Sequence, residues 1–310
     1  MRIFHDYRAV PATAKGASAA IGNFDGVHLG HRAVIDMARG AVPGAPLGIV
    51  TFTPHPREHF APDAPPFRLM SPAARANRLA KLEVDTLFEL PFDAQMAALT
   101  PRDFAQDVLA DGLGLSHVVV GRDFRFGKDR AGDAEMLAAF GAEMGFGVSI
   151  ADLLEGQAGE VSSTAIRRAL TGGRVRDAAA MLGHWHRIEG SVMSGFKRGR
   201  ELGYPTANMS IAGLHPPRFG VYAVLVDVLT GPHEGHYTGA ASLGVRPMFD
   251  GEGANLETFL FDFSGDLYGA ELSVALVEYL RPEATFDTLD AFIAQMDADC
   301  ARARDILEAL

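Results

Sequence analysis

The pattern of the chain changes once, after Leu182, and this change limits the fold more than any other feature. Before it, short β-rich apolar runs alternate with stretches at helical spacing; the runs are 19–24, 48–52, 86–90, 118–120 and 147–150. Alternating strands and helices with short buried strands predict a parallel, doubly wound sheet. Such a sheet binds ligands beyond the carboxyl ends of its strands, where the strand order reverses.

After Leu182 the apolar runs are only strand-like, and Gly, Pro and Asp separate them; they are 188–192, 206–211, 221–229, 239–243, 256–263 and 272–280. Six strands with turn residues between them predict a small antiparallel barrel. An apolar stripe at helical spacing then predicts a terminal helix packed on the barrel. The stripe consists of Leu289, Phe292, Ile293, Met296, Cys300, Ile306, Leu307 and Leu310. We therefore expect two domains, 1–183 and 184–310.

Two helix ends can be predicted in the first half. The pattern indicates a helix over Gly30–Arg39, with Gly40 as its C-terminal cap. A second helix is expected near Thr100, because a threonine hydroxyl can cap a helix whose first position is Pro101.

Composition narrows the class of protein. A length of 310 residues favours two domains, and a formal net charge of −11 argues against a general nucleic-acid binder. Cys300 is the only cysteine, so a reducing compartment is the simplest expectation. The start MRIFHDYRAV does not resemble a secretory signal, and no apolar run approaches the ~20 residues that span a bilayer. We expect a cytoplasmic enzyme without a membrane or nucleic-acid partner; the oligomeric state stays open.

The segment GNFDGVHLGH at 22–31 follows a predicted strand and opens a predicted helix. Gly22 and Gly26 allow the backbone to approach a ligand. His28 and His31 lie at the helix start, where unpaired N–H groups and the helix dipole favour an anion. This pattern predicts a phosphate site. The alternatives are that the two histidines are a cap and a surface residue, or zinc ligands.

Three further segments contain candidate ligand-binding residues. In TFTPHP (51–56), two prolines fix the direction of His55; the alternative is a rigid loop with an exposed histidine. In GRDFRFG (121–127), Phe124 and Phe126 could flank an aromatic ring, and Gly127 permits a close approach, although we expect one of the two phenylalanines to be core. In VSSTAIRR (161–168), Ser163, Thr164 and Arg167 could hold phosphates; the alternative is a plain helix cap.

The second half contains GFKRGRELGYPTAN at 195–208. Its glycines predict a flexible loop that leads into a strand. Thr206 and Asn208 are two residues apart and therefore project to one face of that strand, where a hydroxyl and an amide oxygen suit a magnesium ion with phosphates. The alternative is a solvated polar face.

The chain resembles the adenylyltransferase module of bacterial riboflavin kinase/FAD synthetases, within the H-x-G-H nucleotidyltransferases of Rossmann-like fold. The resemblance rests on four segments in order: GNFDGVHLGH (22–31), TFTPHP (51–56), VVVGRDFRFGKDRAGD (118–133) and VSSTAIRRAL (161–170). The resemblance implies direct transfer of the adenylyl group of ATP to FMN, with Mg²⁺ on the triphosphate. It implies that His28 and His31 are catalytic. The implied ATP- and FMN-binding residues are Gly22, Phe24, Asp25, His55, Asp123, Phe124, Ser163, Thr164 and Arg167. Ala165 stands where the family often has a basic residue, which leaves Arg167 as the expected phosphate ligand.

GFKRGRELGYPTAN, FGVYAV (219–224), SLGVRPMF (242–249), NLETFLFDFSGDLYG (255–269) and the C-terminal segment 280–307 are similar to the riboflavin kinase module of the same enzymes. Met248 stands where the family commonly has threonine. The similarity implies that Glu257 is the catalytic base and that Thr206 and Asn208 bind magnesium. The implied ATP- and riboflavin-binding residues are Gly195, Lys197, Gly199, Arg200, Gly203, Pro205, Thr206 and Asn208.

The sequence therefore predicts a bifunctional enzyme that converts riboflavin to FMN and FMN to FAD, with ATP as co-substrate. Three alternatives stay open. The protein could be an FMN adenylyltransferase whose barrel only binds flavin or docks. It could be an H-x-G-H transferase that makes a pantetheine or nicotinamide dinucleotide, or a flavin-sensing protein without activity.

Overall fold

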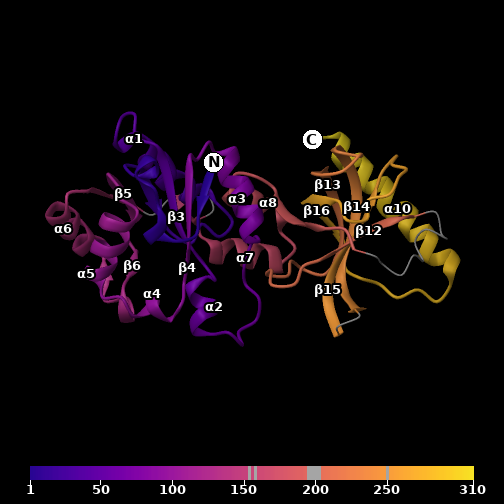
Figure 1. The fold of residues 1–310 in the computed structure, drawn as a ribbon. Helices are drawn as coiled ribbons and strands as arrows, with labels where there is room; N and C mark the ends of the chain where they lie inside the picture. The colour runs from indigo at the N-terminus through magenta and orange to yellow at the C-terminus, as the bar shows by residue number, and fades with distance from the viewer. Residues whose placement is uncertain (153–154, 157–158, 194–203, 249–250) are drawn as a thin grey trace. The chain divides into compact units, whose positions relative to one another are not determined.

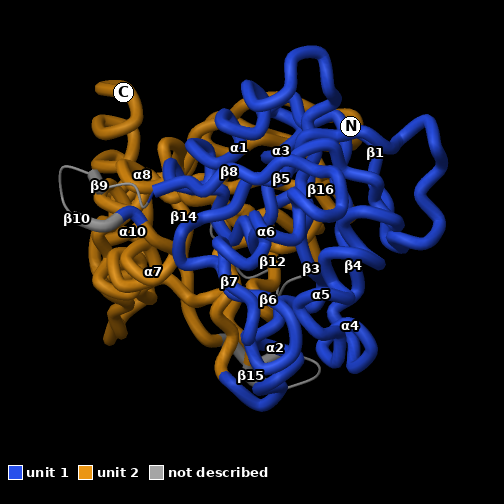
Figure 2. The backbone as a smooth tube through the Cα atoms, turned by 90° about the vertical axis from the view of Figure 1, so that its left-hand side faces the viewer, with its two compact units in different colours: residues 1–64, 75–161 blue, residues 65–74, 162–310 orange. Residues whose placement is uncertain are grey.

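The computed structural model describes residues 1–152, 155–156, 159–193, 204–248 and 251–310. The chain forms two compact units, which Figure 2 shows in two colours: residues 1–64 with 75–161, and residues 65–74 with 162–310. Each unit has its own hydrophobic core. The compact units thus divide the chain at 161/162, whereas the sequence places the domain boundary at 183/184.

The first unit is built on a six-stranded parallel sheet in the order β1-β4-β3-β2-β5-β8. The strands are β1 (Arg2–Phe4), β2 (Ser18–Ile21), β3 (Leu47–Thr53), β4 (Thr86–Pro91), β5 (His117–Gly121) and β8 (Gly147–Ala151). All five predicted strands are present, which confirms the predicted fold class. The short edge strand β1 was not predicted. β2 ends at Ile21 rather than at Phe24, because Phe24 has a φ of 50° and cannot continue an extended strand.

Helices follow the strands, and Figure 1 shows α3 on one side of the sheet and α5 and α6 on the other. They are α1 (Leu29–Ala41), α2 (Pro56–Phe60), α3 (Pro72–Lys81), α4 (Ala94–Ala98), α5 (Pro101–Asp103), a π-helical segment (Phe104–Gly112) and α6 (Ala134–Met144). Thr100 caps α5 as predicted, accepting from the Asp103 amide at 3.1 Å. Gly40 is not a cap: α1 continues through it to Ala41, and Gly40 lacks the positive φ of a capping glycine.

Short elements complete the first unit. They are the 3₁₀ turns Tyr7–Ala9, Ala12–Ala14 and Lys128–Arg130, and the strands β6 (Arg125–Phe126), β7 (Gly132–Asp133), β9 (Glu155–Gly156) and β10 (Gly159–Glu160). β6 pairs with β7 and β9 with β10, each antiparallel.

Strand β5 illustrates why the sheet is covered on both faces. Val118 and Val120 are buried in the core formed with the π-helical segment and α6. Val119 is equally buried, although successive strand side chains point to opposite faces. A strand that is apolar at every position therefore requires packing on both sides, as a doubly wound sheet provides.

The second unit contains the predicted six-stranded antiparallel barrel, in the order β11-β16-β13-β14-β15-β12. Its strands are β11 (His186–Ser191), β12 (Thr206–Ser210), β13 (Gly220–Val228), β14 (Gly235–Met248), β15 (Gly251–Leu260) and β16 (Glu271–Arg281). The two edge strands approach each other through a bridge in which the Met193 amide donates to the Asn208 carbonyl at 2.8 Å. This bridge brings the edges of the curved sheet together.

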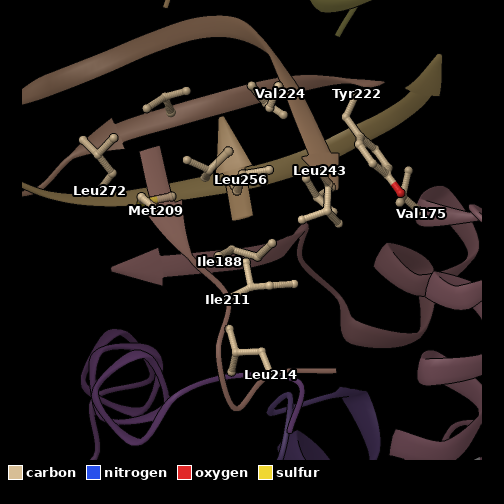
Figure 3. Close-up of a cluster of buried hydrophobic side chains, with 14 of the residues drawn as sticks. Val175, Ile188, Met209, Ile211, Leu214, Tyr222, Val224, Leu243, Leu256 and Leu272 are labelled. Carbon is tan, nitrogen blue, oxygen red and sulfur yellow. The ribbon is translucent and has the colours of Figure 1, made fainter. Parts of the chain in front are cut away.

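The barrel interior is packed with aliphatic side chains from most of its strands, and Figure 3 shows Ile188, Met209, Leu243 and Leu256 among them. Two helices before the barrel, α7 (Ser163–Thr171) and α8 (Val175–Leu182), belong to the same core. Figure 3 shows Val175 of α8 next to the Tyr222 ring. These helices therefore belong physically to the barrel.

The terminal helix α10 (Leu289–Glu308) packs on the outer face of the barrel, around a small core that includes Phe261, Ala303 and Leu307. The predicted stripe is confirmed in its middle, because Cys300 and Ile306 border this core. Its ends are wrong: Leu289, the first residue of the helix, and Leu310, which follows its last turn, are exposed. Burial raises the pKa of the Cys300 thiol to about 11, which keeps it protonated at neutral pH.

A fragment of residues 184–310 is expected to be much less stable than one of residues 162–310. The shorter fragment loses Ile166, Leu170, Val175 and Leu182 from the core. Each buried aliphatic side chain contributes about 1.5–3 kcal/mol, so the loss rivals the about 5–15 kcal/mol that stabilises a whole domain. Urea unfolding followed by the fluorescence of Trp185, the single tryptophan, compares the two fragments. Equal midpoints would show that α7 and α8 are dispensable for the barrel.

The second unit is also expected to lose stability in mild acid. His186 is buried in β11, and burial lowers its pKa from 6.5 to about 3, with smaller contributions from His184 and His215. Between these values only the unfolded chain takes up the proton, so stability is complete above about pH 6.5 and falls as the pH drops toward 3. At pH 5 the loss is about 2 kcal/mol relative to pH 7. Substitution H186L should remove this part of the pH dependence in urea unfolding; an unchanged dependence would assign it to other groups.

Candidate active sites

The first candidate site lies at the carboxyl end of the central strand β2. The chain places β3 and β4 on one side of β2 and then β5 and β8 on the other, so the strand order reverses here. The loop after β2 has positive φ at Phe24, Gly26 and Val27. Such angles are costly for Phe and Val, yet both side chains are fully buried and anchor the loop. The loop therefore has a fixed path to α1.

His28 and His31 are brought together at the end of this loop. His28 is the N-cap of α1, and its Nδ1 accepts from the His31 amide at 3.3 Å. The proton of its neutral ring is then on Nε2, which makes Nε2 a donor. The two imidazoles stack with centroids 3.6 Å apart. A Cβ at Gly30 would lie 3.1 Å from the His28 ring, so glycine leaves room for it.

Burial, helped by the neighbouring His28, lowers the pKa of His31 well below its ordinary value. Its Nδ1 is buried and has no hydrogen-bond partner among the described residues. Both rings are therefore suited to donate to an anion. A bound phosphate would oppose this lowering of the His31 pKa, because its negative charge favours the protonated ring.

Arg75 of α3 fixes the start of the same loop. Its Nη1 donates to the Asn23 carbonyl at 3.0 Å, and its Nη2 donates to Thr53 Oγ1 at 3.0 Å and Glu89 Oε1 at 2.7 Å. The Thr51 hydroxyl also donates to the Asn23 carbonyl, at 3.2 Å. Sequence reasoning missed Arg75, because nothing in PAARANRLAK distinguishes it from a surface arginine.

His55 follows β3 and caps α2: its Nδ1 accepts from the Arg57 amide at 3.0 Å, and Glu58 Oε2 accepts from the His55 amide at 3.0 Å. The peptide between Thr53 and Pro54 is cis. His55 is half-buried and starts a helix, so it is not the exposed residue of a loop. A role of His55 in binding ATP stays a prediction.

The segment after β5 behaves partly as expected. Phe126 is buried against Phe104, and Phe124 stacks on Phe126 with centroids 5.5 Å apart, so one of the two phenylalanines is core. Asp123 is exposed. Gly127 has a φ of 70°, and a Cβ there would lie 2.6 Å from the Pro101 nitrogen. The close approach at Gly127 is therefore to the protein's own backbone.

An aromatic group that sequence reasoning missed adjoins this edge of the sheet. The rings of His59, Phe60 and Phe92 contact one another edge to face, and Phe60 is 69% exposed. Phe92 also contacts Phe52 of β3. In the sequence, Phe60 ends a short helical turn and Phe92 follows a strand. These positions alone do not distinguish the two phenylalanines from core residues.

The residues of VSSTAIRR lie in the second compact unit. Helix α7 begins at Ser163 as predicted, but its N-cap is Ser162, whose Oγ accepts from the Ala165 amide at 3.2 Å. Ser163 and Thr164 are in its first turn. Arg167 Nε donates to the Phe67 carbonyl at 2.5 Å, and its guanidinium lies over the Phe67 ring. Arg167 therefore binds the segment 65–74 through Phe67. Its role as a phosphate ligand stays a prediction.

The second candidate site lies on β12 and β15. Asn208 pairs directly with Glu257 across the two strands, and Thr206 pairs with Phe259. The intervening Ala207 and Met209 point into the core, so Thr206, Asn208 and Glu257 share the outer face. Asn208 Nδ2 lies 3.4 Å from Thr206 Oγ1. The barrel thus brings together the three residues that the sequence selects for phosphoryl transfer.

Asn255, which sequence reasoning missed, orients Asn208. It is buried, and its Nδ2 donates to Asn208 Oδ1 at 3.0 Å. An amide oxygen has two lone pairs, so Oδ1 keeps one for a cation. Tyr204, just before β12, donates its hydroxyl proton to Asp297 of α10, and this bond raises the Tyr204 pKa to about 12.

Known families match both halves of the chain. The family model for FAD synthetase matches residues 10–165, and that for riboflavin kinase matches residues 182–307. A curated bifunctional riboflavin kinase/FMN adenylyltransferase of Pseudomonas fluorescens is 41% identical over 294 residues, covering 94% of this chain and 93% of the relative. That of Escherichia coli K12 is 38% identical over 296 residues, covering 95% and 94%. The chain belongs to this family of bifunctional flavin-cofactor enzymes.

The solved structure of a protein from Streptococcus pneumoniae, which is named a macrolide-efflux protein, has the same fold. It shares 31% identity with this chain at a TM-score of 0.82, with 96% of each chain covered. No helix among the described residues is long and apolar enough to cross a membrane.

Five predicted kinase-site residues, Gly195, Lys197, Gly199, Arg200 and Gly203, lie outside the described residues. Pro205 is exposed at the start of β12, as expected of a residue that directs the chain into a strand.

The residues on the barrel fit the magnesium ion that the family implies. Within the described ranges there is no group of three His, Cys, Asp or Glu that could bind a metal. Magnesium does not need one, because it keeps several waters and binds through few protein oxygens together with substrate phosphates. Thr206 and Asn208 supply a hydroxyl and an amide oxygen, and Glu257 places a carboxylate on the same face.

Proposed function

We propose that the FAD synthetase half performs adenylyl transfer around His28 and His31, and that the barrel phosphorylates riboflavin around Thr206, Asn208 and Glu257. Residues 1–183 and 184–310 are the corresponding catalytic domains, although α7 and α8 pack with the barrel. The observation that carries the kinase assignment is the direct pairing of Asn208 with Glu257 on the outer face. A protein with both modules and one cysteine is proposed to work in the cytoplasm.

In the kinase reaction, Glu257 would accept the proton of the ribityl 5′-hydroxyl as this oxygen attacks the γ-phosphorus of ATP, the bond to the β–γ bridging oxygen breaks, and ADP leaves. Asn255 would keep the Asn208 amide in position. Magnesium, when bound by Thr206 and Asn208, would neutralise part of the triphosphate charge. The glycine-rich segment near Lys197 to Leu202, which lies outside the described residues, is proposed to contribute to ATP binding.

In the adenylyl transfer, an FMN phosphate oxygen would attack the α-phosphorus of ATP in line, and pyrophosphate would leave. His28, His31 and the start of α1 would donate hydrogen bonds to the charge that develops on the α-phosphate. Gly22, Phe24 and Asp25 would form the wall of this site. His55, Asp123, Phe124, Ser163, Thr164 and Arg167 are the further ligand residues proposed.

The experiment is a time course of the purified protein with riboflavin, ATP and magnesium, in which the flavins are separated. FMN should appear first and FAD later, and supplied FMN should give FAD with release of pyrophosphate. Unchanged riboflavin together with FAD from supplied FMN would instead mean that only the adenylyltransferase is active. Repeating the reaction with EDTA tests the requirement for magnesium, and both products should disappear.

A further inference from the structure

The Arg75–Glu89 ion pair is buried beneath the β2–α1 loop. The Arg75 side chain is 7% exposed and that of Glu89 is 13% exposed. The arginine fork joins three segments distant in sequence: the Asn23 carbonyl after β2, the Thr53 hydroxyl at the end of β3, and Glu89 in β4. One guanidinium therefore ties together the carboxyl ends of three neighbouring strands.

A buried ion pair is a poor way to gain stability. Removing two charges from water costs about as much as their attraction returns, and well-packed apolar residues often serve better. This pair also lies near the carboxyl ends of β3 and β4, the edge at which parallel sheets generally bind ligands. Its location suggests a role other than stability.

The loop that Arg75 holds needs a fixed starting point. Phe24 and Val27 adopt positive φ angles within four residues of Asn23, and the loop then delivers His28 to the start of α1. Strained backbone persists only where its surroundings fix it. The Asn23 carbonyl, with donors from Arg75 and Thr51, is the last fixed point before these residues.

We propose that Arg75 is a positioning residue for adenylyl transfer: it fixes the β2–α1 loop so that His28 and His31 keep their stacked arrangement. The inference depends on the proposed role of these histidines. Arg75 acts through the loop, because its hydrogen bonds to the Asn23 carbonyl, Thr53 and Glu89 fix the backbone from which the loop starts.

The test exchanges both charges at once, in the double variant Arg75→Met/Glu89→Leu, so that neither charge is left buried alone. A misplacement of about 1 Å costs on the order of 100-fold in rate. We therefore expect kcat for FAD formation from FMN to fall by about 30–100-fold. KM for ATP and FMN and the melting temperature should stay near wild type. Arg75→Lys keeps one charged donor and should recover part of the lost kcat.

A matched control is Arg102→Gln, which removes an exposed arginine–glutamate pair, with Glu143, from the same unit. Its kcat should equal that of the wild type. If the apolar exchange does not fold, Arg75→Gln/Glu89→Gln replaces it with a neutral polar pair too short to span the same three contacts, and the same fall in kcat is expected. A folded double variant with wild-type kcat would overturn the proposal. If His28→Ala also left FAD formation intact, the assignment of the histidine site would have failed instead.

Discussion

Replacing Glu257 with glutamine is expected to lower the rate of FMN formation by at least about 100-fold. The substitution keeps the shape of the side chain opposite Asn208 and removes only its charge. The 5′-hydroxyl then has no carboxylate to orient it or to take its proton. Initial rates of riboflavin phosphorylation at saturating ATP measure the effect, and KM for ATP should change little.

Two controls separate this result from a folding defect. FAD formation from supplied FMN should persist in E257Q, because the FAD synthetase family match covers residues 10–165. Glu278→Gln is the matched variant: Glu278 is also a strand carboxylate of the barrel, but it pairs with Arg176 of α8. Its kinase rate should be close to wild type. A normal rate in E257Q would mean that Glu257 is only a polar residue on the outer face.

Replacing His28 is expected to have the second large effect, because removal of one donor to a transition-state oxyanion costs about 100–1,000-fold in rate. His28→Asn is sharper than His28→Ala, since asparagine is a good N-cap and preserves the start of α1. In both variants FMN should accumulate from riboflavin while FAD formation nearly stops. Pyrophosphate release from ATP and FMN measures the loss directly.

The comparison between these two variants separates capping from chemistry. If asparagine restored FAD formation and alanine did not, His28 would be a cap, as one reading of its sequence position suggests. The exposed His236 of the barrel provides a control, and His236→Ala should form both products at normal rates.

The elements and the fold were predictable because their signals are local. Five parallel strands, six barrel strands and the terminal helix follow from apolar periodicity, and the Thr100 cap follows from adjacent residues. Family resemblance selected the histidines of the first site and the three residues that the barrel brings together. Their register across β12 and β15 became known only from the structure.

What could not be predicted depends on contacts between distant residues. The Arg75 hydrogen bonds join positions 14 to 52 residues apart, and no short motif encodes such pairing. The packing of α7 and α8 into the barrel was invisible for the same reason, since their apolar faces would suit either unit. At Gly127 the residue type signalled a close approach, but not that Pro101 is the neighbour.

The membership of residues 65–74 in the second unit also affects how the protein is made. The backbone of Arg68 forms a β-bridge with that of Leu214, and Leu69 is buried in the barrel core. On a ribosome that adds about 5–20 residues per second, the bridge partner Leu214 follows this segment by about 7–30 s. Until then Leu69 has no barrel core to enter, although the strands of the first unit are synthesised in the meantime. The barrel core is thus completed by a segment that is synthesised long before the barrel strands. The order of synthesis therefore sets how long this segment stays without its partner.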